Sequence, residues 1–241
     1  MKKALLLCVM LAACASTAWA QAPTGGYPGA QPVNATAGKG VHYIYMVRHG
    51  IYDVDTTATD DRVANGLNTL GHEQARLIGA RLAGLPIKMT HLVSSEFLRA
   101  AQTADDIGRA IKLTPTRDAA LNECTPTSSN AGIMKRELPQ DLAECDSARV
   151  LAWGRYFVPT PDRDTYDVLV CHGNVIRWTL LRALGADTKN WLNPDAANGS
   201  LTIFAVRPDG SVRLVMYSDA GHIPWDKQTW SGKGGGWVMG K

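Results

Sequence analysis

The stretch "YIYMVRHG", residues 43–50, joins an apolar run to an arginine, a histidine and a glycine. The apolar run predicts a buried strand over residues 41–47. Arg48 and His49 cannot fill a core, because an unpaired buried charge is too costly. In open α/β sheets, ligands bind beyond the carboxyl ends of the strands. We therefore expect Arg48 and His49 to belong to a binding or catalytic site.

Strand and helix patterns alternate along the rest of the chain. This alternation predicts an α/β fold of three α/β/α layers with a mainly parallel central sheet. The pattern predicts further strands over 91–94 and 166–171, a hairpin of 201–206 with 212–217, and helices over 70–85, 96–111, 141–156 and 174–184.

The predicted strand 166–171 ends in the same arrangement of residues as the predicted strand 41–47. His172 and Gly173 follow this strand directly, just as His49 and Gly50 follow strand 41–47. A glycine beside each histidine lets backbone and ligand approach closely. Two histidines in the same kind of place favour a site over two unrelated structural histidines.

Two further segments carry charged residues that fit such a site. In "SSEFLRAAQTA", residues 94–104, Arg99 lies in the first turns of a predicted helix. A cation is unusual at this end of the helix dipole, and it is explained if an anion binds beside the free N–H groups there. Glu123 follows in a polar loop and by itself indicates nothing.

Together these pieces resemble the histidine phosphatase superfamily, which has the phosphoglycerate-mutase-like fold. The motifs are Arg-His-Gly at 48–50, the 94–104 segment, the loop glutamate and His-Gly at 172–173, and the resemblance covers about residues 42–220. The stretches "RHGIYDVD", "CHGNVIRW" and "DAGHIPWDK" most resemble the mitochondrial phosphoglycerate-mutase-like serine/threonine phosphatases of that superfamily. The loop "NECTPTSSN" departs from them, and it leaves the substrate open.

The resemblance implies a role for each residue at the centre of the site. His49 would be the nucleophile, which forms a phosphohistidine that water then hydrolyses. Arg48, Arg99 and a protonated His172 would surround the phosphoryl oxygens and stabilise their charge.

The resemblance also implies an acid and a further phosphate ligand. Glu123 would protonate the leaving oxygen and then act as the base for water, with Asp118 and Glu137 as the alternative acids in the same loop region. The backbone N–H of Asn174 would help to hold phosphate. No Cys-x-x-Cys or His-x-x-x-His spacing predicts a metal, and no cofactor is implied.

The ends of the chain have a composition unlike that of the domain between them. Residues 1–20 predict a signal peptide with cleavage after Ala20, although Leu11–Cys14 also resembles a lipobox that would place a lipid on Cys14. Both interpretations predict export, to the periplasm or to the cell surface. Residues 21–40 are rich in Gly and Pro and predict a disordered linker. The histidine phosphatase domain is then expected over 41–220 and a C-terminal tail over 221–241, of which the Gly-rich end 231–241 is expected to be loose.

Charge and cysteines limit the partners and the compartment. The formal net charge is +3, two units of which come from residues 2 and 3, and no basic stripe predicts nucleic-acid binding. No stretch is long enough for a membrane span. Cys171 falls in a predicted buried strand, so in an oxidising compartment Cys124 and Cys145 are the expected pair; three free thiols are the alternative.

The sequence thus predicts an exported phosphatase that hydrolyses phosphomonoesters on a small molecule or a phosphoprotein. A phosphoglycerate-type mutase would use the same residues, and a non-catalytic phosphate-binding module would retain their charge. The oligomeric state is left open.

Overall fold

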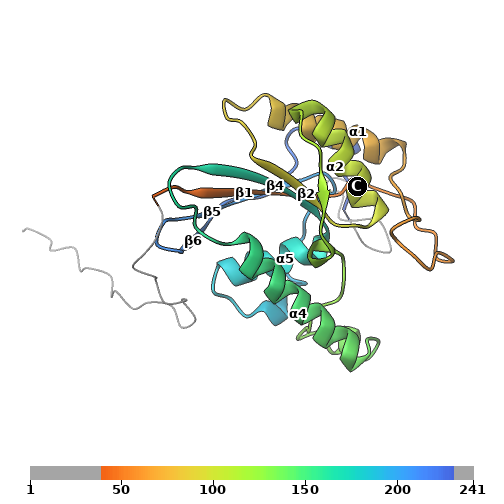
Figure 1. The fold of residues 1–241 in the computed structure, drawn as a ribbon. Coiled ribbons are helices and arrows are strands. Elements are labelled where there is room, and N and C mark those ends of the chain that lie inside the picture. The colour runs from red at the N-terminus through yellow and green to blue at the C-terminus, as the bar shows by residue number, and fades with distance from the viewer. Residues whose placement is uncertain (1–38, 231–241) are drawn as a thin grey trace, which may run out of the picture.

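The computed structural model describes residues 39–230, which form a sheet covered by helices on both faces (Figure 1). The sheet has the strand order β3-β2-β4-β1-β5-β6. Its strands are β1 (His42–Arg48), β2 (His91–Ser94), β3 (Thr116–Arg117), β4 (Thr165–Cys171), β5 (Leu201–Val206) and β6 (Val212–Asp219). The helices are α1 (Thr69–Ala83), α2 (Leu98–Ile111), α3 (Ala131–Met134), α4 (Pro139–Tyr156) and α5 (Gly173–Ala183), with single 3₁₀ turns at Ala119–Leu121, Thr188–Asn190 and Trp225–Lys227.

The sheet is mainly parallel, as predicted. Strands β1, β4, β2 and β3 pair in parallel, and β5 pairs antiparallel with both β1 and β6. In the pairing of β1 with β4, Arg48 lies opposite Cys171. The two strands therefore end level with each other, and the residues that follow them emerge side by side at one edge of the sheet.

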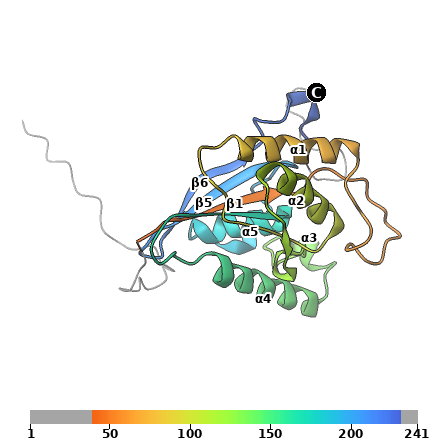
Figure 2. The same ribbon diagram turned by 45° about the horizontal axis from the view of Figure 1, so that its top comes forward.

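Strand β1 is buried on both faces because it supplies side chains to two separate cores. Tyr45 and Val47 pack toward α1 and α2, whereas Ile44 and Met46 pack toward α4 and α5. This division follows from the alternation of side chains along a strand. Figure 2 shows the helices on the two faces of the sheet from another side. The three-layer α/β/α prediction is confirmed.

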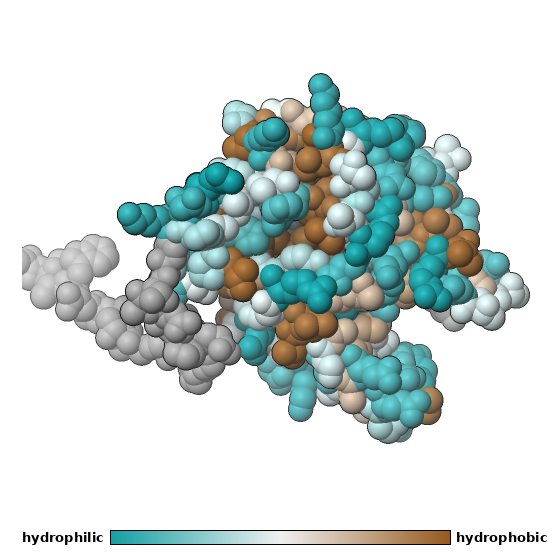
Figure 3. All heavy atoms as spheres, in the orientation of Figure 1, coloured by the Kyte–Doolittle hydropathy of each residue, from teal (hydrophilic) through white to brown (hydrophobic). Residues whose placement is uncertain are grey.

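The face that Figure 3 shows is mostly hydrophilic, with several patches of hydrophobic residues. Scattered exposed apolar side chains are normal for a folded domain. None of the helices within residues 39–230 combines the length and apolar character that crossing a membrane requires.

The first part of the expected C-terminal tail is folded onto the domain. Residues 221–230 pack against the domain, with the side chain of Ile223 only 2% exposed against Ala197 and Ala220. Gln74 of α1 donates from Nε2 to the carbonyl oxygen of Lys227 at 2.8 Å. The apolar Ile223 supplies the physical reason, because its burial favours docking. Residues 231–241 lie outside the described residues.

The predictions for the start of the chain fall almost wholly outside the described residues. These are the signal peptide 1–20, the cleavage after Ala20, the alternative lipid on Cys14 and most of the linker 21–40. The last linker residues are described, and the N–H of Lys39 donates to the carbonyl oxygen of Pro161 at 3.1 Å.

Candidate active site

His49 follows β1 directly, and its ring is held in one tautomer. Its Nδ1 lies 2.7 Å from the carbonyl oxygen of Gly50. A carbonyl oxygen can only accept, so Nδ1 carries the hydrogen and Nε2 of the neutral ring keeps its lone pair. Burial, and then the charges of Arg48 and Arg99, hold the pKa of His49 well below its usual value. The ring of His49 is therefore unprotonated at neutral pH, and a ring in this state is suited to act as a nucleophile.

A contact between two glycines fixes the chain just after His49. A Cβ atom on Gly50 would lie 2.4 Å from the carbonyl oxygen of Gly71, in the first turn of α1, so only glycine allows this approach. The N–H of Gly50 also donates to Oγ1 of Thr103 on α2, at 3.1 Å. Helices α1 and α2 thus hold the loop that carries the histidine.

A second set of contacts holds His49 from the opposite side. Asn198 donates from Nδ2 to the carbonyl oxygen of His49 at 3.2 Å. Asn198 is itself held by Thr229, which accepts from its backbone N–H at 2.8 Å and donates to its Oδ1 at 3.1 Å. The segment 221–230 therefore supports the backbone of His49.

Arg48 and Arg99 place two buried cations beside His49. Each side chain is only 4% exposed. Arg48 donates from Nη1 to the carbonyl oxygen of Ala196, and Arg99 donates from Nη1 to Oδ2 of Asp61 at 2.9 Å. The Nε atoms of both arginines are buried without a hydrogen-bond partner among residues 39–230. Burial of two such cations is costly, and a bound anion would offset that cost.

His172 follows β4, and its ring centroid lies 5.0 Å from that of His49. Its Nε2 lies 2.7 Å from Oγ of Ser95, whose hydroxyl donates to Oδ1 of Asn122 at 2.8 Å. The single hydroxyl hydrogen is used there, so Nε2 of His172 is the donor. Its Nδ1 is buried without a partner among the residues described.

The charge of His172 depends on whether a phosphate is bound. The protonated ring that we expect around a phosphate stays a prediction; without one, burial, the neighbouring His49 and the surrounding arginines lower its pKa well below the usual value. The ring is therefore neutral in the free site. A bound phosphate dianion would change this balance, because a nearby negative charge favours the protonated form.

Glu123 lies in the loop after β3, where the charges of Arg149, Arg48 and Arg177 act on it. Its Oε1 is buried without a partner in the described chain, and its Oε2 lies 3.5 Å from the N–H of Asn174. Burial raises the pKa of the carboxyl, although the charges of Arg149, Arg48 and Arg177 oppose this rise. A carboxyl that keeps its proton to higher pH is suited to act as a general acid.

The two alternative acids are less suited to the role. Burial alone would raise the pKa of Asp118, but hydrogen bonds from Tyr156, the N–H of Ala120 and Arg155 lower it. Asp118 is therefore an ionised partner for these groups. Glu137 precedes α4 and makes no hydrogen bond or ion pair within residues 39–230.

Asn174 lies against the loop of Glu123. Its side chain donates from Nδ2 to the carbonyl oxygen of Cys124 at 2.9 Å, and its Oδ1 accepts from Nη2 of Arg177 at 2.6 Å. Its backbone N–H, which we expected to hold phosphate, points to the Glu123 carboxylate. Asn174 thus braces the acid, and its contact with phosphate stays a prediction.

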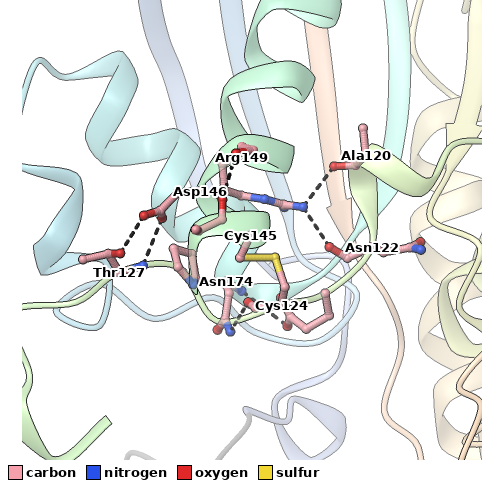
Figure 4. The surroundings of a disulfide bond; sticks show 12 residues. Ala120, Asn122, Cys124, Thr127, Cys145, Asp146, Arg149 and Asn174 are labelled. Atoms are coloured by element: carbon pink, nitrogen blue, oxygen red, sulfur yellow. Dashed lines mark hydrogen bonds between the residues drawn. A yellow bond between two sulfur atoms is a disulfide. The ribbon is translucent and has the colours of Figure 1, made fainter. Parts of the chain in front are cut away.

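The loop of Glu123 is joined to α4 by a disulfide (Figure 4). Cys124 and Cys145 are bonded, with their Cα atoms 5.7 Å apart, which confirms the expected pair. Cys171 is free, and burial raises the pKa of its thiol to about 12. That thiol is therefore protonated and inert at neutral pH.

Three residues at the site were not identified from the sequence. Asp61 pairs with Arg99 from an irregular loop, Ser95 orients His172, and Arg149 reaches the Glu123 loop from α4. Ser95 lies within the "SSEFLRAAQTA" motif and could have been found there. Among the described residues, no group of three or more His, Cys, Asp or Glu side chains could hold a metal ion.

The fold and the site together define an α/β protein whose buried histidines and arginines, at one edge of the sheet, are suited to a phosphate group. Residues 44–144 and 146–219 match the family model of the histidine phosphatase superfamily, branch 1. The chain belongs to this superfamily, and the protein is a phosphatase.

Curated relatives place the chain more narrowly within the superfamily. It is 34% identical over 194 residues to the serine/threonine-protein phosphatase PGAM5, mitochondrial, of Xenopus laevis, with 78% of this chain and 69% of the relative covered. It is 36% identical over 198 residues to the human protein of the same name, with 79% and 67% covered. The resemblance that the motifs suggested is confirmed.

Solved structures share the fold. A phosphoglycerate mutase from Plasmodium falciparum has a TM-score of 0.54 and 26% identity, covering 77% of this chain and 95% of its own. A mycobacterial glucosyl-3-phosphoglycerate phosphatase has a TM-score of 0.54 and 22% identity, covering 74% and 99%.

The relatives correct the expected location. Periplasmic export, with lipidation at Cys14 as the alternative, was inferred from residues 1–20, whereas the similar proteins are named mitochondrial. Their names point away from the periplasm. Basic leaders without acidic residues address proteins to more than one compartment, so the pattern of residues 1–20 was not sufficient for the prediction.

Proposed function

We propose that the protein hydrolyses phosphomonoesters of alkyl alcohols, such as phosphorylated serine and threonine, through a phosphohistidine on His49. One observation carries this proposal: Nδ1 of His49 is committed to the Gly50 carbonyl, which leaves Nε2 as a free lone pair beside two buried arginines. The names of the similar proteins, which specify serine and threonine, support the substrate class.

The first half-reaction transfers the phosphoryl group to the enzyme. Nε2 of His49 attacks phosphorus, and the bond between phosphorus and the ester oxygen breaks. Glu123 gives its proton to the departing oxygen, so an alcohol leaves. Arg48, Arg99 and His172 stabilise the charge on the phosphoryl oxygens, which is the main catalytic requirement in phosphoryl transfer.

The second half-reaction restores the enzyme. Water attacks the phosphorus of phosphohistidine and gives a proton to the carboxylate of Glu123, while the bond to Nε2 breaks. Inorganic phosphate leaves, and both His49 and Glu123 return to their starting states. A mutase would differ only here, because a hydroxyl group of the substrate would replace water as the acceptor.

Trapping the intermediate tests the proposal. Turnover on a phosphoserine peptide is quenched rapidly without acid, and mass spectrometry of the digest should place the phosphoryl group on His49. His49→Ala should show neither the adduct nor turnover, while His91→Ala, which changes an exposed histidine at the other end of the sheet, should keep both. Turnover in His49→Ala would refute the proposal. Faster transfer to added phosphoglycerate than to water would favour a mutase.

A further inference from the structure

We propose that Arg149 of α4 is the positioning residue of Glu123: it holds the loop that carries this acid and places a buried positive charge near its carboxyl group. The inference rests on the proposed role of Glu123. It concerns a residue about 25 positions further along the chain, on a helix that supplies no other group to the reaction.

Arg149 holds the two residues that lead into Glu123. Its side chain is 2% exposed, and its Nη2 donates to the carbonyl oxygens of Ala120 at 3.0 Å and Asn122 at 2.9 Å (Figure 4). Both bonds come from one nitrogen, and the planar guanidinium holds its two N–H donors in fixed directions, whereas the donors of a lysine ammonium rotate. The backbone just before Glu123 is therefore fixed by this one side chain.

Helix α4 holds the other side of Glu123 as well. Cys145 lies one turn before Arg149 on the same face and is bonded to Cys124. Asp146 accepts from the N–H of Thr127 at 3.0 Å and from its Oγ1 at 2.6 Å. Glu123 thus lies between two stretches of chain, and contacts from α4 hold both of them in place.

The guanidinium of Arg149 is more than a structural bridge. Its Nε and Nη1 are buried and have no hydrogen-bond partner in the described part of the chain. The carboxylate whose negative charge stabilises the protonated guanidinium is that of Glu123. A buried cation without a close ion-pair partner is costly, and a purely structural link to two carbonyls would not require a charge.

Several other groups face Glu123, and each contributes to its titration. Arg48 approaches from the end of β1, Arg177 and the N–H of Asn174 from α5, and the Cys171 thiol lies nearby at the end of β4. Among the charges that lower the pKa of Glu123, that of Arg149 is the largest, and burial acts in the opposite direction. Loss of the Arg149 charge should therefore raise this pKa further.

The test compares pH profiles of kcat/KM for two substrates. The phosphoserine peptide needs an acid for its leaving group, and 4-nitrophenyl phosphate does not. The parameter kcat/KM reports the free enzyme and the steps up to phosphoryl transfer, so the later role of Glu123 as a base does not enter. On the peptide, activity should fall as the pH rises through the pKa of Glu123, and this limb should be absent in Glu123→Gln.

Two variants separate charge from shape. Arg149→Gln keeps an amide donor for the carbonyls but removes the charge, and we expect the falling limb on the peptide to move up by about one pH unit. Arg149→Lys keeps the charge, and its limb should stay near that of the wild type while kcat/KM drops. Arg163→Gln, an exposed site whose side chain makes no hydrogen bond or ion pair among residues 39–230, is the matched control.

The position of a limb on the pH axis does not depend on how much enzyme is folded, so a destabilised variant still gives an answer. An unmoved limb in Arg149→Gln, with equal loss on both substrates, would overturn the inference and leave the role of Glu123 intact. A wild-type profile on the peptide without a limb that depends on Glu123 would overturn that role, and the inference with it.

Discussion

Arg99 and Asp61 form an ion pair at the edge of the site, with Nη1 of Arg99 2.9 Å from Oδ2 of Asp61. The guanidinium is 4% exposed and the carboxylate 31%. The carbonyl oxygen of Asp61 also accepts from the N–H of Leu98 at 2.7 Å, at the start of α2. Asp61 therefore orients the arginine, and it also places a negative charge near the expected position of the phosphate.

Removal of that negative charge should tighten phosphate binding. Asp61→Asn keeps an oxygen that can accept from Arg99 but loses the repulsion toward a dianion. We expect inorganic phosphate to inhibit the variant about two- to fivefold more strongly, which corresponds to about 0.4–1 kcal/mol for partly exposed charges. Inhibition constants at two salt concentrations provide the measurement, with Asp60→Asn on the exposed neighbour as control. Weaker inhibition would show that Asp61 acts only by positioning.

Glu123→Gln should separate substrates by their leaving groups. General acid catalysis contributes about 10²–10⁴-fold, so activity on the phosphoserine peptide should fall by about that factor. Activity on 4-nitrophenyl phosphate should fall far less, because nitrophenolate leaves without a proton. Glu137→Gln, in the same loop region, should match the wild type on both substrates. Equal loss on both substrates in Glu123→Gln would assign the residue to binding or to hydrolysis of the phosphoenzyme.

The low pKa of His49 should make the free protein less stable in mild acid. Below about pH 6.5 the unfolded histidine takes up a proton that the buried ring refuses, so the free energy of unfolding decreases as the pH falls. Between pH 7.5 and 5.5, one such group accounts for about 1.4 kcal/mol. Denaturant unfolding of His49→Gln should show a pH dependence weaker by about this amount. An identical dependence in wild type and variant would mean that His49 has the same pKa in the folded and unfolded chain.

The disulfide should stabilise the fold and support the acid together. It closes a loop with a sequence separation of 21, for which chain entropy gives about 3 kcal/mol. A Cys124→Ser, Cys145→Ser double variant should lose about that much stability, and it should lose more activity on the phosphoserine peptide than on 4-nitrophenyl phosphate. Peptide mapping without reduction should find the bond. Two free thiols in the native protein would contradict the pairing.

The central part of the site was predictable because it depends on two adjacent strands. Apolar runs identified β1 and β4, and their parallel pairing brings His49 and His172 together at one edge. Residues that follow neighbouring parallel strands must lie close, whatever the loops do. The same logic placed Cys171 inside the sheet and left Cys124 and Cys145 as the pair.

What escaped prediction depends on contacts between distant segments. An arginine such as Arg149 in an amphipathic helix usually faces solvent, and nothing in its neighbours marks it as buried. Asp61 reaches Arg99 from an irregular loop, which has no period to read. The charge of His172 depends on burial and on the sum of nearby cations, and neither is visible before the chain is folded.

The bonds that run from Thr229 through Asn198 to His49 matter for anyone who shortens or tags this protein. A boundary drawn at residue 220, where the sheet ends, looks safe by secondary structure. Such a cut would remove Thr229, leave the Asn198 amide free to turn, and loosen the backbone of the nucleophile from 180 positions away in the chain. A shortened version for expression should therefore extend through Trp230, and a fused partner should be joined beyond it.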